Sequence, residues 1–494
     1  MKKFLTAILC FGFIATNTLA LEGELGYFGG TTPGTKIPDS IVLAQTRFEV
    51  DDNYVLPYKE TVYLTGKPIV VEGTLEIQPG EIDPDSSSGG YSESYIIRAI
   101  SEDEQTEISR TLTLDTIYAK NDITGQVTKS SNVGNWTEMI VAEGTTYTLD
   151  PERSNFSKSI IEDYTPGVKY YSGDIYYTAC YTAGADAETI MEVDSRVYGY
   201  DQAFAKSEVQ QRSIIIDDGE NQYYIEETPS TTMTKELSYS GNQPIAISFA
   251  GNYKEVIQGQ GSTVYNMLIA GDEVHPKDQK GSFSVKDSPS IAQLSTPSIE
   301  SLIGHPAKSD VAKLYAMGIF DKRPEAFSTN QVVTRGEYIK MLVKALKIPL
   351  PDFDDRRGDQ IKNPFEGEIS ADDSFYPYYL AAYEAGLIID TVNANDFLTR
   401  EQMIVFNIRA LGLSRLGANA FNSQMAFIDD SLISDYAKSS IYAATKIGIL
   451  PITNGYLFPQ KYVTYQDCAA LLNDFINYLR YDLQKDYNQY IMTW

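Results

Sequence analysis

Two arginines stand at matching places in a repeated pattern near the C-terminus and could bind an anionic ligand. Arg335 follows Thr334, and Arg400 follows Thr399. The planar guanidinium group of arginine suits a carboxylate. A positive side chain in the first turn of a helix opposes the helix dipole, so neither arginine helps its helix to form. We therefore expect both to contact a ligand; the alternative is that each is solvated or paired with a neighbouring acid.

The threonines before these arginines belong to three copies of one helix-start pattern, spaced by 65 residues. Each is followed three residues later by an acid or amide: Thr334 with Glu337, Thr399 with Gln402, and Thr464 with Asp467. In such a capping box the threonine oxygen and the third side chain each accept a backbone N–H that the helix leaves unpaired. The pattern predicts structural caps at all three threonines.

A second predicted helix lies upstream of each cap and stops at a glycine. Gly318, Gly386 and Gly448 are each followed by two apolar residues, and glycine suits the left-handed end of a helix. Each unit is therefore predicted to be a helix, a glycine stop, a short loop and a capped helix. Because one such unit cannot bury its apolar faces alone, we expect the three units to pack together.

The charge balance excludes some classes of partner. A formal net charge of −27 argues against nucleic-acid and anionic-membrane binding, which need basic patches. With only two histidines, most histidine-based catalysis and zinc chemistry are excluded. The excess carboxylates could hold calcium, and the acidic loop Asp83–Gly90 is a candidate, but its spacing does not fit an EF-hand. We therefore predict no cofactor.

The N-terminus predicts export. Lys2 and Lys3 precede an apolar run that ends near the small residues Thr18-Leu19-Ala20, so residues 1–20 are predicted to be a signal peptide. After its cleavage the protein is expected to be soluble and to lack a membrane span. Cys180 and Cys468 fall in different predicted domains and are expected to be buried rather than disulfide-bonded.

Residues 21–286 are predicted to be all-β and sandwich-like, as one or two domains with a possible break near 150–165 around a helix-like piece. Residues 287–298 are rich in serine and proline and are predicted to be a linker. The strands are expected to be short and separated by turns: Thr61–Leu64, Ile69–Val71, Tyr95–Ile100, Thr111–Tyr118, Tyr170–Tyr181, Ser213–Ile216, Tyr223–Ile225 and Ile245–Phe249.

The C-terminal units resemble the S-layer homology (SLH) family. Thr334-Arg335-Gly336-Glu337 and Thr399-Arg400-Glu401-Gln402 match its helix-opening tetrapeptide. Phe353-Asp354-Asp355 and Phe427-Ile428-Asp429 match its opening, and Gly455–Pro459 resembles its loop. The resemblance covers about 297–479, and we divide it into motifs at 299–348, 349–413 and 414–480, followed by a tail at 481–494.

The resemblance implies a pseudo-threefold helical domain that binds cell-wall polysaccharide, often pyruvylated, in grooves between the motifs. The signature arginine is the residue taken to contact the sugar. The third copy departs from the family by placing Tyr465 at this position, so its groove could bind by stacking a sugar on the ring, or not at all. The predicted ligand-binding residues are Arg335, Arg400, Glu337, Gln402, Asp355 and Asp429.

Three functions are compatible with these features. The first is a surface protein held to wall polysaccharide or peptidoglycan by its motifs, with the β region facing outward for surface-layer self-association or partner binding. The second is a wall-tethered enzyme such as a glycoside hydrolase with two carboxylates. The third is an adhesin that uses its many tyrosines. Because the sequence carries no nucleophile-elbow, phosphate-loop or metal motif, we predict that the chain is not an enzyme.

Overall fold

The structure is a computed structural model. It describes residues 30–37, 53–80, 86–121, 124–184, 187–239, 252–270, 279–351, 364–365, 369–389, 393–414, 416–417, 427–450 and 452–487.

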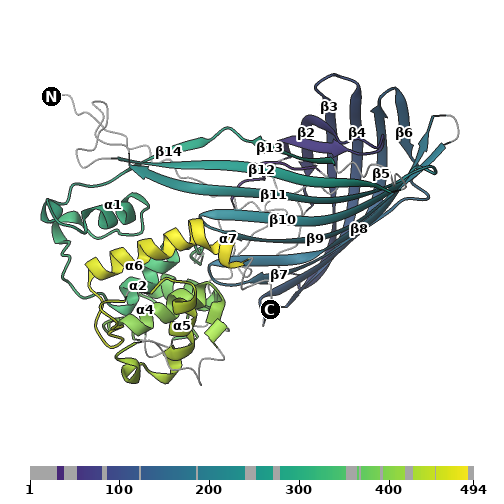
Figure 1. The fold of residues 1–494 in the computed structure, drawn as a ribbon. Coiled ribbons are helices and arrows are strands. Elements are labelled where there is room, and N and C mark those ends of the chain that lie inside the picture. The colour runs from purple at the N-terminus through teal and green to yellow at the C-terminus, as the bar shows by residue number, and fades with distance from the viewer. Residues whose placement is uncertain are drawn as a thin grey trace, which may run out of the picture.

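A single antiparallel sheet forms the N-terminal part (Figure 1). Its main path follows the chain from β1 to β13, with β7 pairing β5 and β8, and β14 pairing β12. The strands are β1 Tyr54–Val62, β2 Ile69–Gln78, β3 Ser88–Ser101, β4 Thr106–Asn121, β5 Gln126–Ala142, β6 Thr145–Leu149, β7 Asn155–Tyr164, β8 Val168–Ala183, β9 Ala187–Gln202, β10 Ala205–Asp217, β11 Gln222–Tyr239, β12 Asn252–Ala270, β13 Gln279–Lys286 and β14 Ser290–Ser295.

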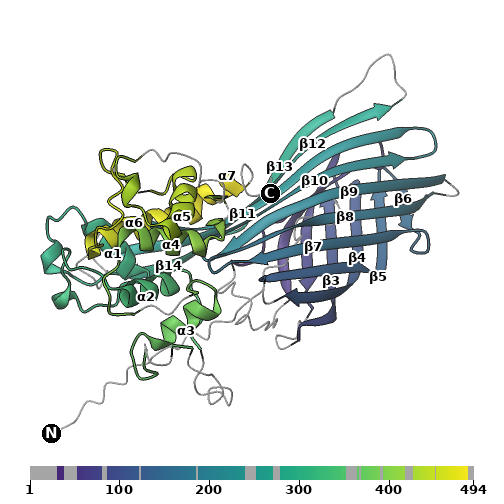
Figure 2. The ribbon, with the colours of Figure 1, turned by 90° about the horizontal axis from the view of Figure 1, so that it is seen from below.

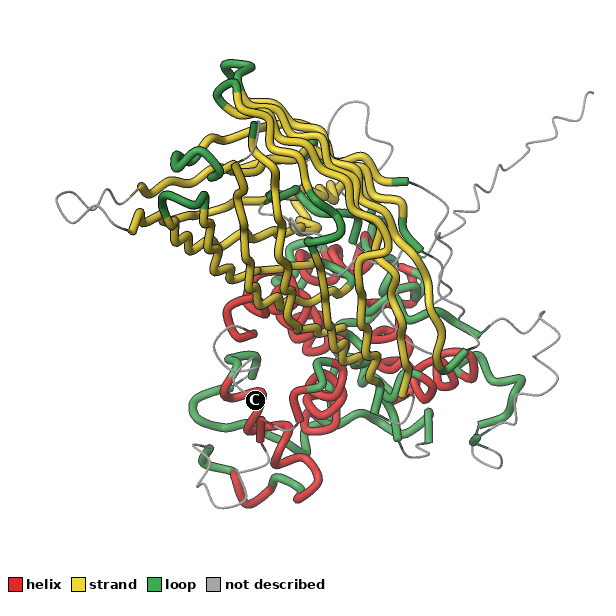
Figure 3. Tube along the Cα trace, turned by 90° about the vertical axis from the view of Figure 1, so that its right-hand side faces the viewer, coloured by secondary structure: helices red, strands yellow, loops and turns green. Residues whose placement is uncertain are grey.

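The sheet curves around a packed interior (Figure 3). Along β4 and β11 buried and exposed residues alternate, as strands with one face inward require. The all-β prediction is confirmed, but the short, sandwich-like strands are not observed. Many strands exceed a dozen residues, because polar residues on either side of the predicted strand segments continue the ladders.

Two predicted boundaries fall within this sheet. The helix-like piece expected near 150–165 is the strand β7, and the sheet runs through it without interruption. The predicted linker at 287–298 contains β14, which pairs with the first half of β12. The candidate strand Ile245–Phe249, the signal segment 1–20 and the loop residues Asp83 and Asp85 lie outside the described residues.

Among the described residues six main helices follow, with the glycine stops and caps where the sequence predicts them. Gly318, Gly386 and Gly448 all have the left-handed backbone of a helix end. Thr334, Thr399 and Thr464 each form a capping box. The helices are α1 Lys308–Ala316, α2 Arg335–Ala345, α3 Tyr376–Glu384, α4 Arg400–Ala410, α5 Asp435–Lys446 and α6 Tyr465–Asn477, followed by a π-helical turn at Tyr478–Asp482 and the short α7 Leu483–Asp486.

The helices gather at one end of the sheet (Figure 2), and one apolar core runs across the boundary. The hydroxyl of Tyr170, at the start of β8, donates to the carbonyl of Leu411 at 3.1 Å. Tyr487, after α7, stacks on Tyr170 with 5.4 Å between ring centroids and donates its hydroxyl to the carbonyl of Tyr171. The segment predicted to be a tail therefore begins as part of this boundary.

Within the described ranges, every helix is too short or too polar to cross a membrane. Cys180 and Cys468 are both buried and free, as the sequence analysis predicts.

Candidate functional site

The three capped helices begin at one place, where the segments before them pair in a circle. The N–H of Val333 donates to Val463 at 2.8 Å, that of Val463 to Leu398 at 2.9 Å, and that of Leu398 to Val333 at 3.0 Å. All three side chains are fully buried. The circle joins residues that are 65 or more positions apart, so each helix start is set by the other two motifs.

Backbone carbonyls of a second motif complete each helix start. The N–H groups of Arg335 and Gly336 donate to Asp396 and Ala394, each at 2.9 Å. Arg400 and Glu401 donate in the same way to Lys461 and Pro459, and Tyr465 and Gln466 donate to Gln331 and Thr329. These bonds satisfy first-turn donors that a helix leaves unpaired.

Arg335 lies between two motifs and is partly exposed. Its Nη1 is 3.1 Å from Asp396 Oδ2, and its Nε donates to Gln402 Oε1 at 3.3 Å. Gln402 is itself the third residue of the α4 capping box. The arginine predicted to bind a ligand is therefore also a link from the first motif to the second.

Arg400 is buried, with 6% of its surface exposed. Burial lowers the pKa of its guanidinium group, and the nearby carboxylates of Asp467 and Asp429 oppose that shift. Asp467 is the capping-box acid of α6, so Arg400 faces the third motif as Arg335 faces the second.

Tyr465 completes this pattern in the third motif. Its hydroxyl donates to Glu337 Oε1 at 2.6 Å, and Glu337 is the capping-box acid of α2. Burial, with the bond to Glu337, raises the pKa of the Tyr465 hydroxyl well above its usual value. Arg335 and Tyr465 thus each bond to the capping residue of another motif, and Arg400 lies within electrostatic reach of one.

Of the two aspartates predicted to bind a ligand, Asp429 and Asp355, the structure describes only the first. Asp429 is buried, and its two oxygens accept the backbone N–H groups of Leu457 and Phe458 at 2.9 and 2.7 Å. It holds the loop of the third motif, and its predicted contact with a ligand stays untested. Asp355 lies outside the described residues.

A pocket of about 170 Å³ opens beside Glu337 and Tyr465. The loop after α1 supplies Asp321 and Lys322, and α2 supplies Lys340. Phe375, at the start of α3, closes another side. The pocket therefore draws on all three motifs.

Charged groups of both signs line this pocket. Lys340 Nζ lies 2.7 Å from Asp321 Oδ2, and Lys322 Nζ lies 4.6 Å from the centre of the Tyr465 ring. Burial would raise the pKa of Asp321, but hydrogen bonds from Lys340 and Lys344 outweigh it and lower the pKa. The pocket thus offers ammonium groups and aromatic rings, the groups that bind an anionic sugar.

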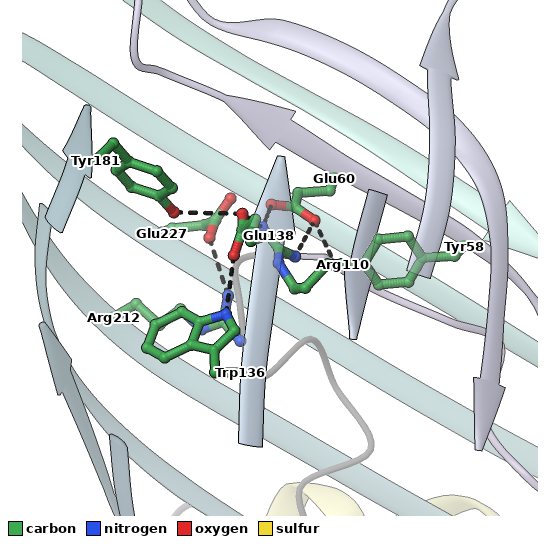
Figure 4. A network of polar contacts seen from close by, with 8 residues as sticks. All are labelled: Tyr58, Glu60, Arg110, Trp136, Glu138, Tyr181, Arg212 and Glu227. Carbon is green, nitrogen blue, oxygen red and sulfur yellow. Dashed lines mark hydrogen bonds and ion pairs between the residues drawn. The ribbon is translucent and has the colours of Figure 1, made fainter. Parts of the chain in front are cut away.

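A second polar cluster lies inside the sheet (Figure 4). Arg110 on β4 donates to Glu60 of β1 at 2.8 and 3.0 Å and to Glu138 of β5 at 2.6 Å. Trp136 and Tyr181 also donate to Glu138. Each of these carboxylates is at most 5% exposed.

Glu227 adds a third carboxylate to this cluster. Burial raises its pKa to about 7, although Arg212 and a hydrogen bond from Tyr63 act in the opposite direction. A carboxyl group with such a pKa can carry a proton at neutral pH. Among the described residues, no group of three or more histidine, cysteine, aspartate or glutamate side chains is arranged to hold a metal ion.

The two lysines of the pocket were not predicted from the sequence. Lys322 follows the glycine stop of α1, and Lys340 lies one turn into α2. The repeat comparison could not find them because it used only positions shared between copies.

Comparisons with known proteins support part of the family assignment. Residues 302–339 match the S-layer homology domain. This segment runs from the turn before α1 into α2 and includes Arg335 and Glu337. The match lies in the first predicted motif and leaves the other two unconfirmed.

Three curated relatives match a limited stretch. An exoglucanase XynX of Acetivibrio thermocellus is 29% identical over 161 residues, an amylopullulanase of Thermoanaerobacterium thermosulfurigenes is 30% identical over 155, and an endoglucanase of a Bacillus strain is 28% identical over 152. Each match covers 30% of this chain. It covers 13%, 8% and 15% of the respective relatives, so the chain spans less than a sixth of their length.

These relatives contradict the prediction that the chain is not an enzyme, because all three are named as glycoside hydrolases. The domain match indicates a cell-surface protein associated with the cell wall.

Proposed function

We propose that this protein attaches non-covalently to cell-wall polysaccharide through three S-layer homology motifs. The observation that carries the proposal is the pocket beside Tyr465, which combines Lys322 and Lys340 with aromatic walls. An anionic group such as a pyruvate ketal would accept hydrogen bonds from the lysines, and a sugar ring would lie against the aromatic side chains.

The three motifs would form one pseudo-threefold domain. Support comes from the closed circle of Val333, Leu398 and Val463, and from the helix starts that are each completed by a second motif. In this arrangement Arg335, Arg400 and Tyr465 occupy equivalent places, with Gln402, Asp467 and Glu337 as their respective partners. A ligand at Arg335 would compete with Gln402 and Asp396, so this arginine would exchange a protein contact for a sugar contact.

The attachment is tested with the full chain and purified, protease-treated cell-wall sacculi. We expect co-sedimentation with intact sacculi and loss of binding after hydrofluoric acid removes the wall polysaccharide. Equal binding to stripped sacculi would reject the polysaccharide and point to peptidoglycan.

The pocket itself is tested by Lys340→Gln, with Lys344→Gln as the matched control. Both lysines pair with Asp321, at 2.7 and 2.8 Å, but Lys340 lines the pocket. We expect Lys340→Gln to weaken binding about tenfold, the loss of one charge-assisted contact, and Lys344→Gln to leave it nearly unchanged. Equal effects of the two substitutions would remove the pocket from the proposal.

The remaining parts of the proposal concern export and the β region. Residues 1–20 would direct export, and the β region would face outward for envelope assembly, self-association or partner binding. The helices gather at one end of the sheet, so attachment through them would leave the other end extending away from the wall.

A glycoside hydrolase is a second candidate, which the names of the relatives favour. The carboxylates in Figure 4 are the described group to test, because Glu227 can carry a proton while Glu60 and Glu138 face arginine. Release of reducing sugar from a glucan, abolished by Glu138→Gln in a folded variant, would establish it. Activity that survives this substitution would place the catalytic group elsewhere.

A further inference from the structure

A pair of stacked aromatic rings projects from the loop of the third motif that Asp429 holds. The rings of Tyr456 and Phe458 lie 5.3 Å apart at an interplanar angle of 18°. Their exposed fractions are 37% and 42%, and Ile428, which packs beside Gly455, is 66% exposed. The three side chains form an exposed apolar surface, which we call the hairpin platform.

A tight hairpin presents this platform. Thr453 and Tyr456 exchange two backbone hydrogen bonds of 3.0 Å. Asn454 and Gly455 lie between them and both have positive φ, as a type I′ hairpin turn requires. The N–H of Ile428 donates to the carbonyl of Gly455, so the hairpin is fixed to the segment before α5.

Phe458 has a backbone conformation that an aromatic residue rarely adopts. Its φ is +53°, in the left-handed region. The carboxylate of Asp429 holds it there by accepting the N–H groups of both Leu457 and Phe458. Leu457 is fully buried, while the Phe458 ring points outward. Strain of this kind persists where surrounding contacts enforce it and often marks a functional site.

The aromatic character of this position belongs to the third motif alone. Counting back six residues from the capping threonines gives Ser328, Asn393 and Phe458. All three are exposed, and each is followed by a buried residue. The first two motifs thus have a polar residue where the third has a phenylalanine, and Ser328 does not share the left-handed backbone of Phe458. Neither the ring nor its strain is therefore a general feature of the motifs.

We propose that the hairpin platform binds a pyranose ring of the wall polysaccharide by stacking, as a second contact in addition to the pocket. The idea rests on the proposed wall attachment. A typical protein interface takes roughly 20–30 residues from each partner, so a platform of three side chains suits a small ligand such as a sugar ring better than a protein. Tyrosine also offers an apolar face with a hydroxyl at its rim. Asp429 acts here as a positioning residue.

The test is Phe458→Asn in the full chain, measured by binding to protease-treated sacculi and by thermal unfolding. Asparagine tolerates positive φ and is the residue of the second motif, Asn393. We expect binding to weaken about tenfold, as for the loss of one aromatic contact. The unfolding midpoint should not fall, because the substitution relieves strain. Tyr239→Asn, which removes an exposed ring from the β region, should change neither measurement.

The outcomes separate this idea from the wall attachment itself. If the unaltered chain fails to bind sacculi, the attachment is wrong. If the unaltered chain binds and Phe458→Asn binds equally well, the platform is wrong and the attachment stands. A loss of binding together with a lower unfolding midpoint would show that Phe458 is a structural residue, which also overturns the platform.

Discussion

At the scale of single residues, the same position in each motif combines a structural contact with a place at the proposed site. Arg335 and Tyr465 each contact the capping residue of another motif. Tyr465 keeps this contact through one hydroxyl, which explains how the third copy tolerates the loss of arginine. Another residue whose role can be tested lies in the β region: the buried carboxyl group of Glu227, which has a raised pKa.

Glu227→Gln should make stability less dependent on pH. The pKa of Glu227 rises from 4.5 to about 7 on folding, so the folded chain binds more protons and loses stability as pH rises through this range. Glutamine cannot ionise. We therefore expect the free energy of unfolding of the variant to rise relative to that of the unaltered chain between pH 4.5 and 8, by at most about 3 kcal/mol.

Chemical denaturation at several pH values measures this difference. Glu226→Gln is the matched control, since Glu226 is the exposed neighbour on β11. A difference for Glu227→Gln that is constant with pH would contradict the raised pKa.

At the scale of elements, the capped helices are local structures that a non-local circle completes. Each threonine caps its own helix, as the spacing of the residues predicts. The next backbone donors of that helix bind carbonyls of a different motif. A cap therefore contributes to the helix and also to the junction of the three motifs.

Thr334→Ala should destabilise the helical part by about 1 kcal/mol, since the side chain accepts the N–H of Glu337. Thermal unfolding followed by the circular dichroism signal of the helices measures the effect. Ser328→Ala, an exposed serine in the loop before this cap, should change the midpoint little. Equal shifts for the two variants would mean that the cap is not what stabilises α2.

At the scale of the whole molecule, the helical part and the sheet share one core. Tyr487 fills a place among Tyr170, Tyr198 and Tyr200 of the sheet. The Gln202 side chain donates to the carbonyl of Leu479 at 2.7 Å, and Gln484 donates to Ser207 Oγ. These contacts hold the sheet in a set orientation relative to the helices, so attachment at the wall would also orient the sheet.

Tyr487→Ala should lower the unfolding midpoints of both parts, because removing a buried aromatic ring costs about 3–5 kcal/mol. Hydrogen exchange should increase in β8 and β9 as well as around α7. Tyr481→Ala removes an exposed tyrosine from the same segment and should have little effect. Faster exchange confined to the C-terminal segment would show that the two parts are not coupled.

The sequence by itself determined the helical units, because caps, glycine stops and apolar stripes are patterns within a dozen residues. It also indicated a β-rich region, through the frequency of tyrosine, threonine and β-branched residues. It did not reveal β7 or β14, whose residues read as a helix and a linker until their partner strands are known. The buried charges of β1, β4 and β5 were equally hidden, since Glu60, Arg110 and Glu138 look like surface residues in sequence.

Only the tertiary structure decided how distant segments meet. Three features join residues that are far apart in the chain. They are the circle through Val333, Leu398 and Val463, the pocket between motifs, and the packing of Tyr487 against the sheet. No local pattern encodes such pairings, because their free energy comes from burying complementary surfaces that exist only after the helices and strands have formed.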